Sequence, residues 1–194
     1  KIDPSITFND ITKDFGDADF PLSATSNSTG TFTFAIADAS VATVIGNSVT
    51  IVGAGSSLVT VTQVSDANYN SIVATMTLVV NKIDPSITFN DITKDFGDAD
   101  FPLSATSNST GTFTFAIADA SVATVIGNSV TIVGAGSSLV TVTQVSNSSF
   151  NIGLAVMTLT INDVILDVDG DGVNDDDDAF PLDPDEDTDT DDDG

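Results

Sequence analysis

The chain repeats itself with a long period. The decapeptide KIDPSITFND at Lys1 returns at Lys82, which gives a period of 81 residues, and the two copies are identical over their first 65 residues. The first difference is Asp66, which becomes Asn147 in the second copy. A period of this length is too long for one solenoid turn and suits one small domain. We therefore expect three segments: a first domain at 1–81, a second domain at 82–162, and a tail at 163–194.

Within one copy, apolar and polar residues alternate with period two, which is the pattern of β-strands. In Thr31–Ala37, for example, Phe32, Phe34 and Ile36 alternate with smaller or polar residues. We expect an all-β fold of about seven short strands per copy, without helices, and a loop over 9–19. The expected strands of the first copy are Ser5–Phe8, Phe20–Ser26, Thr31–Ala37, 41–45, Val49–Val52, Leu58–Val64 and Ile72–Val80.

Two stretches of each copy resemble bacterial immunoglobulin-like repeats. SVATVIGNSVTIVGAGSSLVTVTQ, followed by DANYN and a closing strand, is similar to the second half of such domains. KDFGDADFPLSATSNSTG is similar to the first half of the variant found in long bacterial surface proteins. The resemblance implies two tandem immunoglobulin-like β-sandwiches at a bacterial cell surface or in a secreted protein. Phe32, Phe34 and Tyr69 could form a sugar-stacking platform, but core packing of the phenylalanines is the better interpretation.

Composition excludes several classes of function. The formal net charge is −25, with four lysines and no arginine, so the chain cannot neutralise a nucleic-acid backbone or an anionic membrane surface. It has no cysteine and no histidine, so the usual nucleophile–base pairs of enzymes cannot be built. No apolar run is long enough to span a bilayer. We expect neither catalysis nor membrane insertion.

The acidic tail carries calcium-ligand spacing. Counting from Asp167, carboxylates at positions 1, 3, 5, 9 and 12, a glycine at position 6 and the Val173 carbonyl at position 7 match an EF-hand loop. Hard oxygen donors without histidine or cysteine favour Ca²⁺. The segment DAFPLDPDEDTDTDDDG, from Asp178 onward, resembles a thrombospondin type 3 repeat, which implies little regular secondary structure. A second loop begins at Asp189 and stops at position 6. The expected ligands are Asp167, Asp169, Asp171, Val173, Asp175, Asp178, Asp189, Asp191 and Asp193.

A further calcium ion could bind where the two copies meet. The link at Asp84-Pro85 is short and extended, because proline restricts the residue before it. Acidic loops of the first copy are expected to end near this link. Either these residues simply form turns, which is the commoner role of aspartate, or they hold a bridging ion. The junction ligands would be Asp17, Asp19, Asp38 and Asp84.

The function expected from the sequence is that of a non-catalytic stalk or spacer. We expect a calcium-rigidified part of a large extracellular adhesin, and a fragment of that longer chain. The alternatives are an accessory region of a secreted polysaccharide-degrading enzyme and a glycan-binding module. Expected partners are the neighbouring domains of the same chain, a glycan or cell-surface ligand bound outside this fragment, and other copies of the chain.

Overall fold

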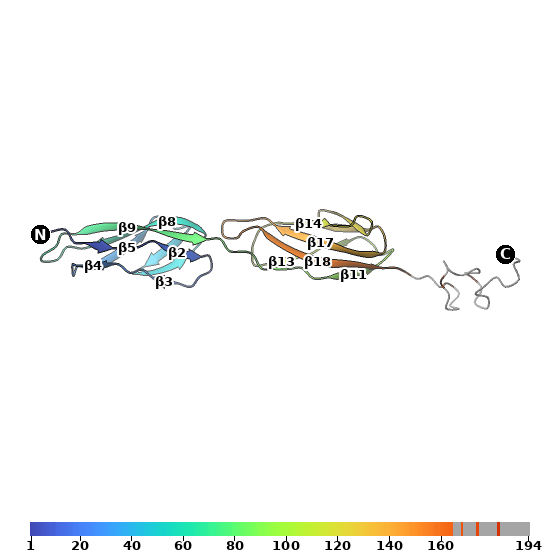
Figure 1. Cartoon of the computed structure of the whole chain (residues 1–194), viewed down its shortest axis with the longest axis horizontal. Coiled ribbons are helices and arrows are strands. Elements are labelled where there is room, and N and C mark those ends of the chain that lie inside the picture. Colours follow the sequence, from blue (N-terminus) through green and yellow to red (C-terminus); the bar gives the residue numbers. More distant parts are fainter. Residues whose placement is uncertain (165–167, 169–173, 175–181, 183–194) are drawn as a thin grey trace. The chain divides into compact units, whose positions relative to one another are not determined.

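The computed structural model describes residues 1–164 together with Val168, Asn174 and Leu182. The described chain is all-β. Its packing divides it into two compact units whose bounds differ from those of the copies, because the first unit also includes Ser107–Phe113 and Thr143–Leu154. Among the described residues, no helix has the length and apolar character needed to cross a membrane. Nine strands in residues 6–81 recur 81 residues later with the same lengths. Figure 1 shows the strands of both copies. The chain therefore builds the same immunoglobulin-like fold twice.

The first copy contains a four-stranded sheet in the order β2-β9-β8-β5, a three-stranded sheet in the order β3-β7-β6, and the small pair β1-β4. In the larger sheet β8 pairs antiparallel with β5 and with β9, whereas β2 pairs parallel with β9. These strands are β1 (Ile6–Thr7), β2 (Ile11–Asp14), β3 (Phe20–Pro21), β4 (Thr25–Ser26), β5 (Phe32–Ile36), β6 (Ala42–Ile45), β7 (Ser48–Ile51), β8 (Gly55–Gln63) and β9 (Ile72–Asn81).

The second copy repeats this arrangement, with sheets β11-β18-β17-β14, β12-β16-β15 and β10-β13. Its strands are β10 (Ile87–Thr88), β11 (Ile92–Asp95), β12 (Phe101–Pro102), β13 (Thr106–Ser107), β14 (Phe113–Ile117), β15 (Ala123–Ile126), β16 (Ser129–Ile132), β17 (Gly136–Gln144) and β18 (Gly153–Asn162).

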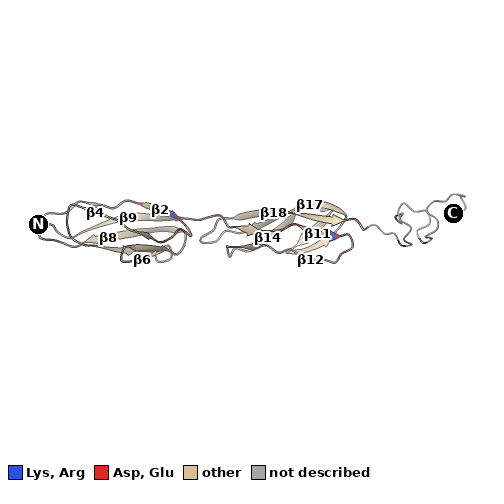
Figure 2. Cartoon of the chain, turned by 90° about the horizontal axis from the view of Figure 1, so that it is seen from below, with Lys and Arg blue, Asp and Glu red and all other residues tan. Residues whose placement is uncertain are grey.

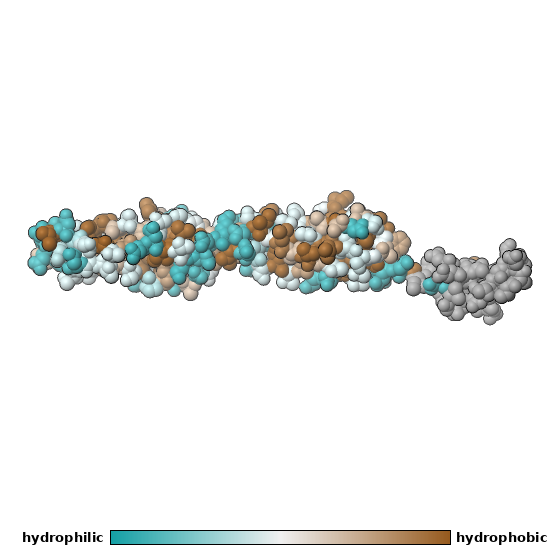
Figure 3. Space-filling model, in the orientation of Figure 1, coloured by the Kyte–Doolittle hydropathy of each residue, from teal (hydrophilic) through white to brown (hydrophobic). Residues whose placement is uncertain are grey.

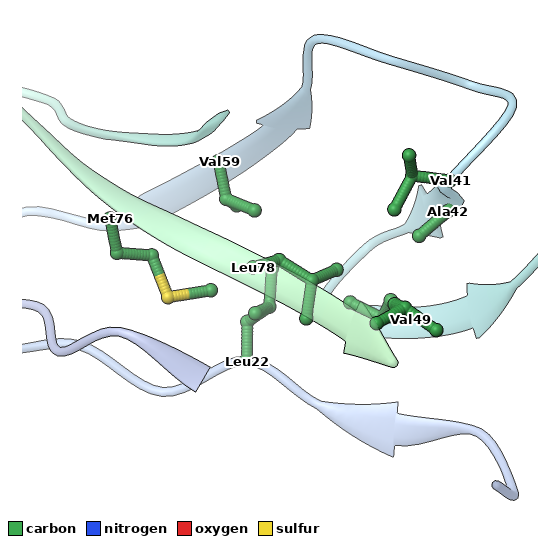
Figure 4. Packing of buried hydrophobic residues seen from close by; sticks show 8 residues of the cluster. Leu22, Val41, Ala42, Val49, Val59, Met76 and Leu78 are labelled. Carbon is green, nitrogen blue, oxygen red and sulfur yellow. The ribbon is translucent and has the colours of Figure 1, made fainter. Parts of the chain in front are cut away.

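Alternate residues of the long strands build the core of the first copy. Met76, Leu78 and Val80 point inward from β9, and Val59 points inward from β8. Figure 4 shows Val59, Met76 and Leu78 together with Leu22, Val41, Ala42 and Val49 of the same cluster. A side-chain period of two on one buried face fixes the strand register, because a slip of one residue would expose the whole apolar set. The buried cluster is Leu22, Val41, Ala42, Val49, Val59, Met76, Leu78 and Val80.

The structure corrects two expectations about the first copy. The segment 9–19 is not all loop, because Ile11–Asp14 forms β2 along the edge of the larger sheet. Its sequence, ITKD, has too few apolar residues to show a strand period, and pairing with β9 holds it extended. The segment Phe20–Ser26 is not one strand, because β3 and β4 belong to different sheets.

Candidate functional site

The first and last strands of the larger sheet form a parallel seam in each copy. In the first copy β2 runs beside β9 from Ile11 opposite Leu78 to Asp14 opposite Asn81. Just beyond β2, the amide of Phe15 donates to the carbonyl of Asn81 over 2.9 Å. At the other end, the amide of Asn70 donates to the carbonyl of Ile2 over 2.8 Å. The start of the copy is therefore bonded to its end along the length of the sandwich.

Aspartate side chains reinforce this seam in the first copy. Asp3 Oδ1 accepts from Asn70 Nδ2 at 2.8 Å, and Asp14 Oδ1 accepts from Asn81 Nδ2 at 2.9 Å. Between them, Asp10 Oδ1 accepts from the backbone amide of Thr77 at 2.6 Å. In each case the partners are 67 residues apart, which is also the offset between strand partners such as Ile11 and Leu78. These contacts cross-link the two ends of the copy.

The second copy repeats the three cross-links with closely matching distances. Asn151 Nδ2 donates to Asp84 Oδ1 at 2.8 Å, and Asn162 Nδ2 donates to Asp95 Oδ1 at 2.9 Å. The backbone amide of Thr158 donates to Asp91 Oδ1 at 2.6 Å. Asp84, which the sequence suggested as a junction ligand, thus has a hydrogen-bond partner within its own copy.

The other suggested junction ligands also accept hydrogen bonds within the first copy. Asp17 Oδ2 accepts from the amide of Asp14 at 3.1 Å, and Asp19 Oδ2 accepts from Thr50 Oγ1 at 2.9 Å. Asp38 Oδ1 accepts from both the hydroxyl and the amide of Ser40, at 2.6 and 2.9 Å. The Ser40 hydroxyl, followed by its amide, lowers the pKa of Asp38. The contacts of Asp17 and Asp38 are the local, turn-forming roles that aspartate commonly takes, whereas Asp19 connects its loop to β7 over 31 residues of sequence.

Within the described part of the chain, no group of three or more histidine, cysteine, aspartate or glutamate residues is arranged to hold a metal ion. A calcium ion at the junction stays a prediction. The tail ligands expected from the sequence lie outside the described residues, and so does their arrangement. These are Asp167, Asp169, Asp171, Val173, Asp175, Asp178, Asp189, Asp191 and Asp193.

Asp66 connects the turn at 27–30 to its own loop in the first copy, and this role was not predicted from the sequence. Its Oδ2 accepts from the hydroxyls of Ser28 and Thr29 and from the amide of Thr29, at 2.8–3.0 Å. Its Oδ1 accepts from the amides of Asn68 and Tyr69, both at 2.8 Å. Hydrogen bonds from the Tyr69 amide, the Ser28 hydroxyl and the other donors hold the pKa of Asp66 well below its ordinary value.

The second copy keeps this arrangement with an amide. Asn147 Oδ1 accepts from the amides of Ser149 and Phe150, both at 2.9 Å. Asn147 Nδ2 donates to the hydroxyls of Ser109 and Thr110, at 3.1 and 3.2 Å. Hydroxyls can donate to a carboxylate or accept from an amide, so they tolerate the exchange. The signal available in the sequence was the aspartate two residues before Asn68, which is the spacing of an Asx turn.

Gln63 is a fully buried polar residue that pins the turn at 27–30. Its Nε2 donates to the carbonyls of Ser28 and Gly30, at 3.1 and 2.8 Å. Its Oε1 is buried and has no hydrogen-bond partner among the described residues. Gly30 is required here, because a Cβ at this position would overlap the carbonyl oxygen of Val64.

The phenylalanines suggested as a sugar platform belong to the packing of the first copy. Phe34 lies 5.8 Å from Phe8 and 6.4 Å from Phe32, measured between ring centroids. Phe8 and Phe34 pack against the buried cluster, and the rings of β5 stay half-buried beside an open groove. Tyr69 is also half-buried, and its backbone amide is held by Asp66. This arrangement favours core packing over a stacking platform.

No protein-family model matches the chain, and no curated protein sequence matches it. Among solved structures, Drosophila N-cadherin EC1-4 is 14% identical, with a TM-score of 0.36, over 84% of this chain and 50% of that one. Titin domains Z1Z2 in complex with telethonin are 15% identical, with a TM-score of 0.36, over 83% and 96% of the two chains. Domains 4 and 5 of the S-layer protein SbsC are 18% identical, with a TM-score of 0.31, over 68% and 76%. The chain thus spans half the length of the cadherin structure.

Proposed function

We propose that this chain is a non-catalytic, load-bearing spacer of a bacterial surface or secreted protein, in which each copy carries tension between its neighbours. The parallel seam between β2 and β9 is the observation that carries this proposal. The absence of histidine and cysteine from the sequence supports a role without catalysis. The extracellular setting rests on the resemblance to bacterial immunoglobulin-like repeats.

The direction of the two seam strands determines how tension acts on a copy. Because β2 and β9 are parallel, both strands begin at the same end of the sandwich. Tension pulls β2 back toward its beginning and β9 forward toward its end. The backbone hydrogen bonds between them are therefore sheared together instead of opening one at a time. The Asp3–Asn70, Asp10–Thr77 and Asp14–Asn81 contacts lie along the same seam and share the load.

Single-molecule stretching of the full chain tests this role. The expected result is two separate unfolding events, each releasing up to roughly 280 Å of contour length for an 81-residue copy. Both events should need more force than the unfolding of a β-sandwich whose terminal strands are pulled apart so that their hydrogen bonds open one at a time. Extension at low force without two resolved events would contradict the proposal.

We further propose that the acidic tail binds calcium and becomes ordered when it does. Support comes from the spacing of Asp167, Asp169 and Asp171 and from the density of charge, since 16 acidic residues lie in the last 32. Without a cation such charges repel one another and oppose ordering. Extracellular calcium modules bind at about 10⁻⁴–10⁻³ M, a range that outside fluids reach and cytosol does not.

A calcium titration of the full chain, monitored by isothermal calorimetry and circular dichroism, tests whether the tail binds calcium and becomes ordered. Asp171→Ala should abolish binding at the first loop, whereas Asp163→Ala, which lies outside the loop, should leave it intact. An isotherm that shows no calcium uptake by the unaltered chain would overturn the calcium proposal without affecting the load-bearing one.

A further inference from the structure

The duplication allows the same residue to be compared in two surroundings. Residues 1–65 and 82–146 are identical in sequence and form strands of the same lengths. A residue that is covered in one copy and exposed in the other therefore owes the difference to a group outside this repeated stretch. Exposure of an apolar side chain is a weaker guide by itself, because hydrophilic and hydrophobic side chains are interspersed on the visible face of the molecule (Figure 3).

Two residues of the repeated stretch differ clearly in exposure between the copies. Phe15 is half-buried, whereas its counterpart Phe96 has 47% of its surface exposed. Ile83 is also half-buried, whereas its counterpart Ile2 has 64% exposed. Phe15 and Phe96 directly follow β2 and β11, which are labelled in Figure 2, and the amide of each donates to the last residue of the neighbouring seam strand over 2.9 Å. Among the described residues, the ring at the end of the seam is therefore covered more fully in the first copy.

The group that covers Phe15 is the ring of Phe150. Their centroids lie 5.5 Å apart and the ring planes meet at 74°, which is an edge-to-face arrangement. Both residues belong to the first compact unit. Phe150 is only 9% exposed, although it is not part of the buried cluster of the second copy. Ser149 is buried too, and its hydroxyl oxygen lies 3.7 Å from the ideal Cβ position of Gly53, so the loop 147–151 packs against the end of the first copy.

The same loop is held by bonds to the first residues of the second copy. Lys82 Nζ donates to the carbonyl of Asn147 at 2.6 Å. The amide of Asn151 donates to the carbonyl of Ile83 at 2.9 Å, and Ile83 forms a β-bridge with Phe150. A loop that is already held in place loses little conformational entropy when it packs against another surface.

Three of the first four differences between the copies lower the cost of burying this loop. Asn147, Ser149 and Phe150 stand where the first copy has Asp66, Asn68 and Tyr69. These changes remove a carboxylate, shorten a polar side chain and remove a phenol hydroxyl. Buried charges and unpaired polar groups are destabilising. The loop of the second copy is therefore better suited to packing than its counterpart, whose residues 68 and 69 are more exposed than 149 and 150.

We propose that the loop 147–151 is an interaction surface that docks on the end of the first copy through Phe150 and clamps the end of the β2–β9 seam. The ring that it contacts belongs to Phe15, whose amide donates to the last residue of β9. Opening of this bond requires Phe15 to move, and the docked ring opposes the movement. The partner of the first copy is thus the next copy, and docking does not depend on a metal ion. The proposal deepens the load-bearing role and rests on it only for the consequence under tension.

Hydrogen exchange of individual amides, measured by NMR on the full chain in EDTA, tests the clamp. The amides of Phe15 and Phe96 are a matched pair, because their surrounding sequence is identical and each has an acceptor at 2.9 Å. Exchange of such amides reports local opening. The Phe15 amide should exchange about tenfold more slowly, which corresponds to about 1.4 kcal/mol and lies within the range of an aromatic pair. An NOE between ring protons of Phe15 and Phe150 should accompany this difference.

Two single substitutions in the second copy separate docking from general stability. Phe150→Ala removes the docked ring, so it should speed exchange of the Phe15 amide about tenfold. Phe96→Ala removes the identical ring from the seam of the second copy and should leave exchange at Phe15 unchanged. Circular dichroism shows whether each variant keeps its fold. If Phe150→Ala does not fold, Phe150→Leu keeps an apolar side chain without the aromatic edge and should still speed exchange at least about twofold.

Three results would overturn the proposal. Equal exchange at Phe15 and Phe96, or no NOE between the two rings, would show that the loop is not docked. Unchanged exchange at Phe15 in a folded Phe150 variant would show that the ring does not clamp the seam. Equal acceleration by Phe150→Ala and Phe96→Ala would assign the effect to the stability of the second copy. None of these results bears on whether the β2–β9 seam carries tension, which the stretching measurement tests separately.

Discussion

Gln63→Glu is the substitution with the sharpest expected effect on the first copy. The native Nε2 donates to two carbonyl oxygens, of Ser28 and Gly30, from a side chain that is fully buried. A glutamate of the same shape would place a carboxylate oxygen against these two carbonyls. An ionised carboxylate has no proton to donate, and a protonated one can donate to only one of them.

The expected cost arises from the change in the pKa of the new glutamate. Unfolded glutamate has a pKa near 4.3, and buried glutamates without a counter-ion reach about 8–9. The difference of about 4 units corresponds to roughly 5 kcal/mol at pH above the folded-state pKa. This loss is comparable with the whole stability of a small domain, which is about 5–15 kcal/mol. Because the folded-state pKa is raised, the loss should shrink as the pH falls toward that of unfolded glutamate.

Tyr69 makes this prediction measurable in one copy at a time. It is the only tyrosine, and the chain has no tryptophan, so intrinsic fluorescence reports the first copy alone. In denaturant titrations at pH 7, Gln63→Glu should move the Tyr69 transition to much lower denaturant, and less so at pH 5. Gln144→Glu, the matched change in the second copy, should leave that transition in place. An unshifted Tyr69 transition in Gln63→Glu would refute the role given to this amide.

Two further predictions concern the same end of the first copy. Gly30→Ala should destabilise the first copy by more than about 2 kcal/mol in the same denaturant titration, because the new Cβ overlaps a backbone carbonyl. Gly46→Ala should cost only about 1 kcal/mol. A Cβ at Gly46 meets nothing within 4 Å, and the cost arises from its positive φ of 65°. Asp66 should make the first copy sensitive to acid: its pKa is lowered in the folded state, so its stabilisation is present above about pH 4 and is lost as the pH falls further. Acid titrations followed by Tyr69 fluorescence should therefore show a smaller loss of stability in Asp66→Asn than in the unaltered chain, and equal losses would contradict the hydrogen-bond account.

The repeat, the fold class and most long strands could be predicted from the sequence. Strands β5, β8 and β9 alternate apolar with polar or small residues over part of their length, as in VTVT of β8 and ATMTL of β9, and their ends fall within three residues of the expected positions. Local alternation is enough here because each strand buries one face. The short strands were harder, since Pro21 and Thr25 lie close together in sequence but in different sheets.

The seam could not be predicted, because it depends on a pairing between distant residues. Nothing in the local sequence Asp10–Asp14 indicates that Asp10 will accept a hydrogen bond from the amide of Thr77, or that Asp14 will accept one from Asn81. Once the parallel register is known, the constant offset of 67 residues explains these contacts together. The sequence therefore suggested metal binding at the junction, whereas the structure shows that each suggested ligand accepts a hydrogen bond. These ligands are Asp17, Asp19, Asp38 and Asp84.

Proline substitutions in β2 separate the seam from the rest of the fold. The Phe15 amide donates to the Asn81 carbonyl, whereas the Asp14 amide donates to Asp17 Oδ2. Backbone amides of a strand point alternately to its two sides, so the Lys13 amide points toward β9 and the Thr12 amide points away from it. Lys13→Pro removes a seam hydrogen bond, whereas Thr12→Pro removes an amide that faces away from β9. Lys13→Ala accounts for the lysine side chain, whose Nζ lies 5.1 Å from the ring centroid of Phe20.

The unfolding force of the first copy under end-to-end tension, compared between these variants, tests the load-bearing role most directly. Lys13→Pro should lower the force of one of the two unfolding events and leave the other unchanged. Thr12→Pro and Lys13→Ala should unfold close to the force of the unaltered chain. Equal forces for Lys13→Pro and Thr12→Pro would show that the seam between β2 and β9 does not carry the load.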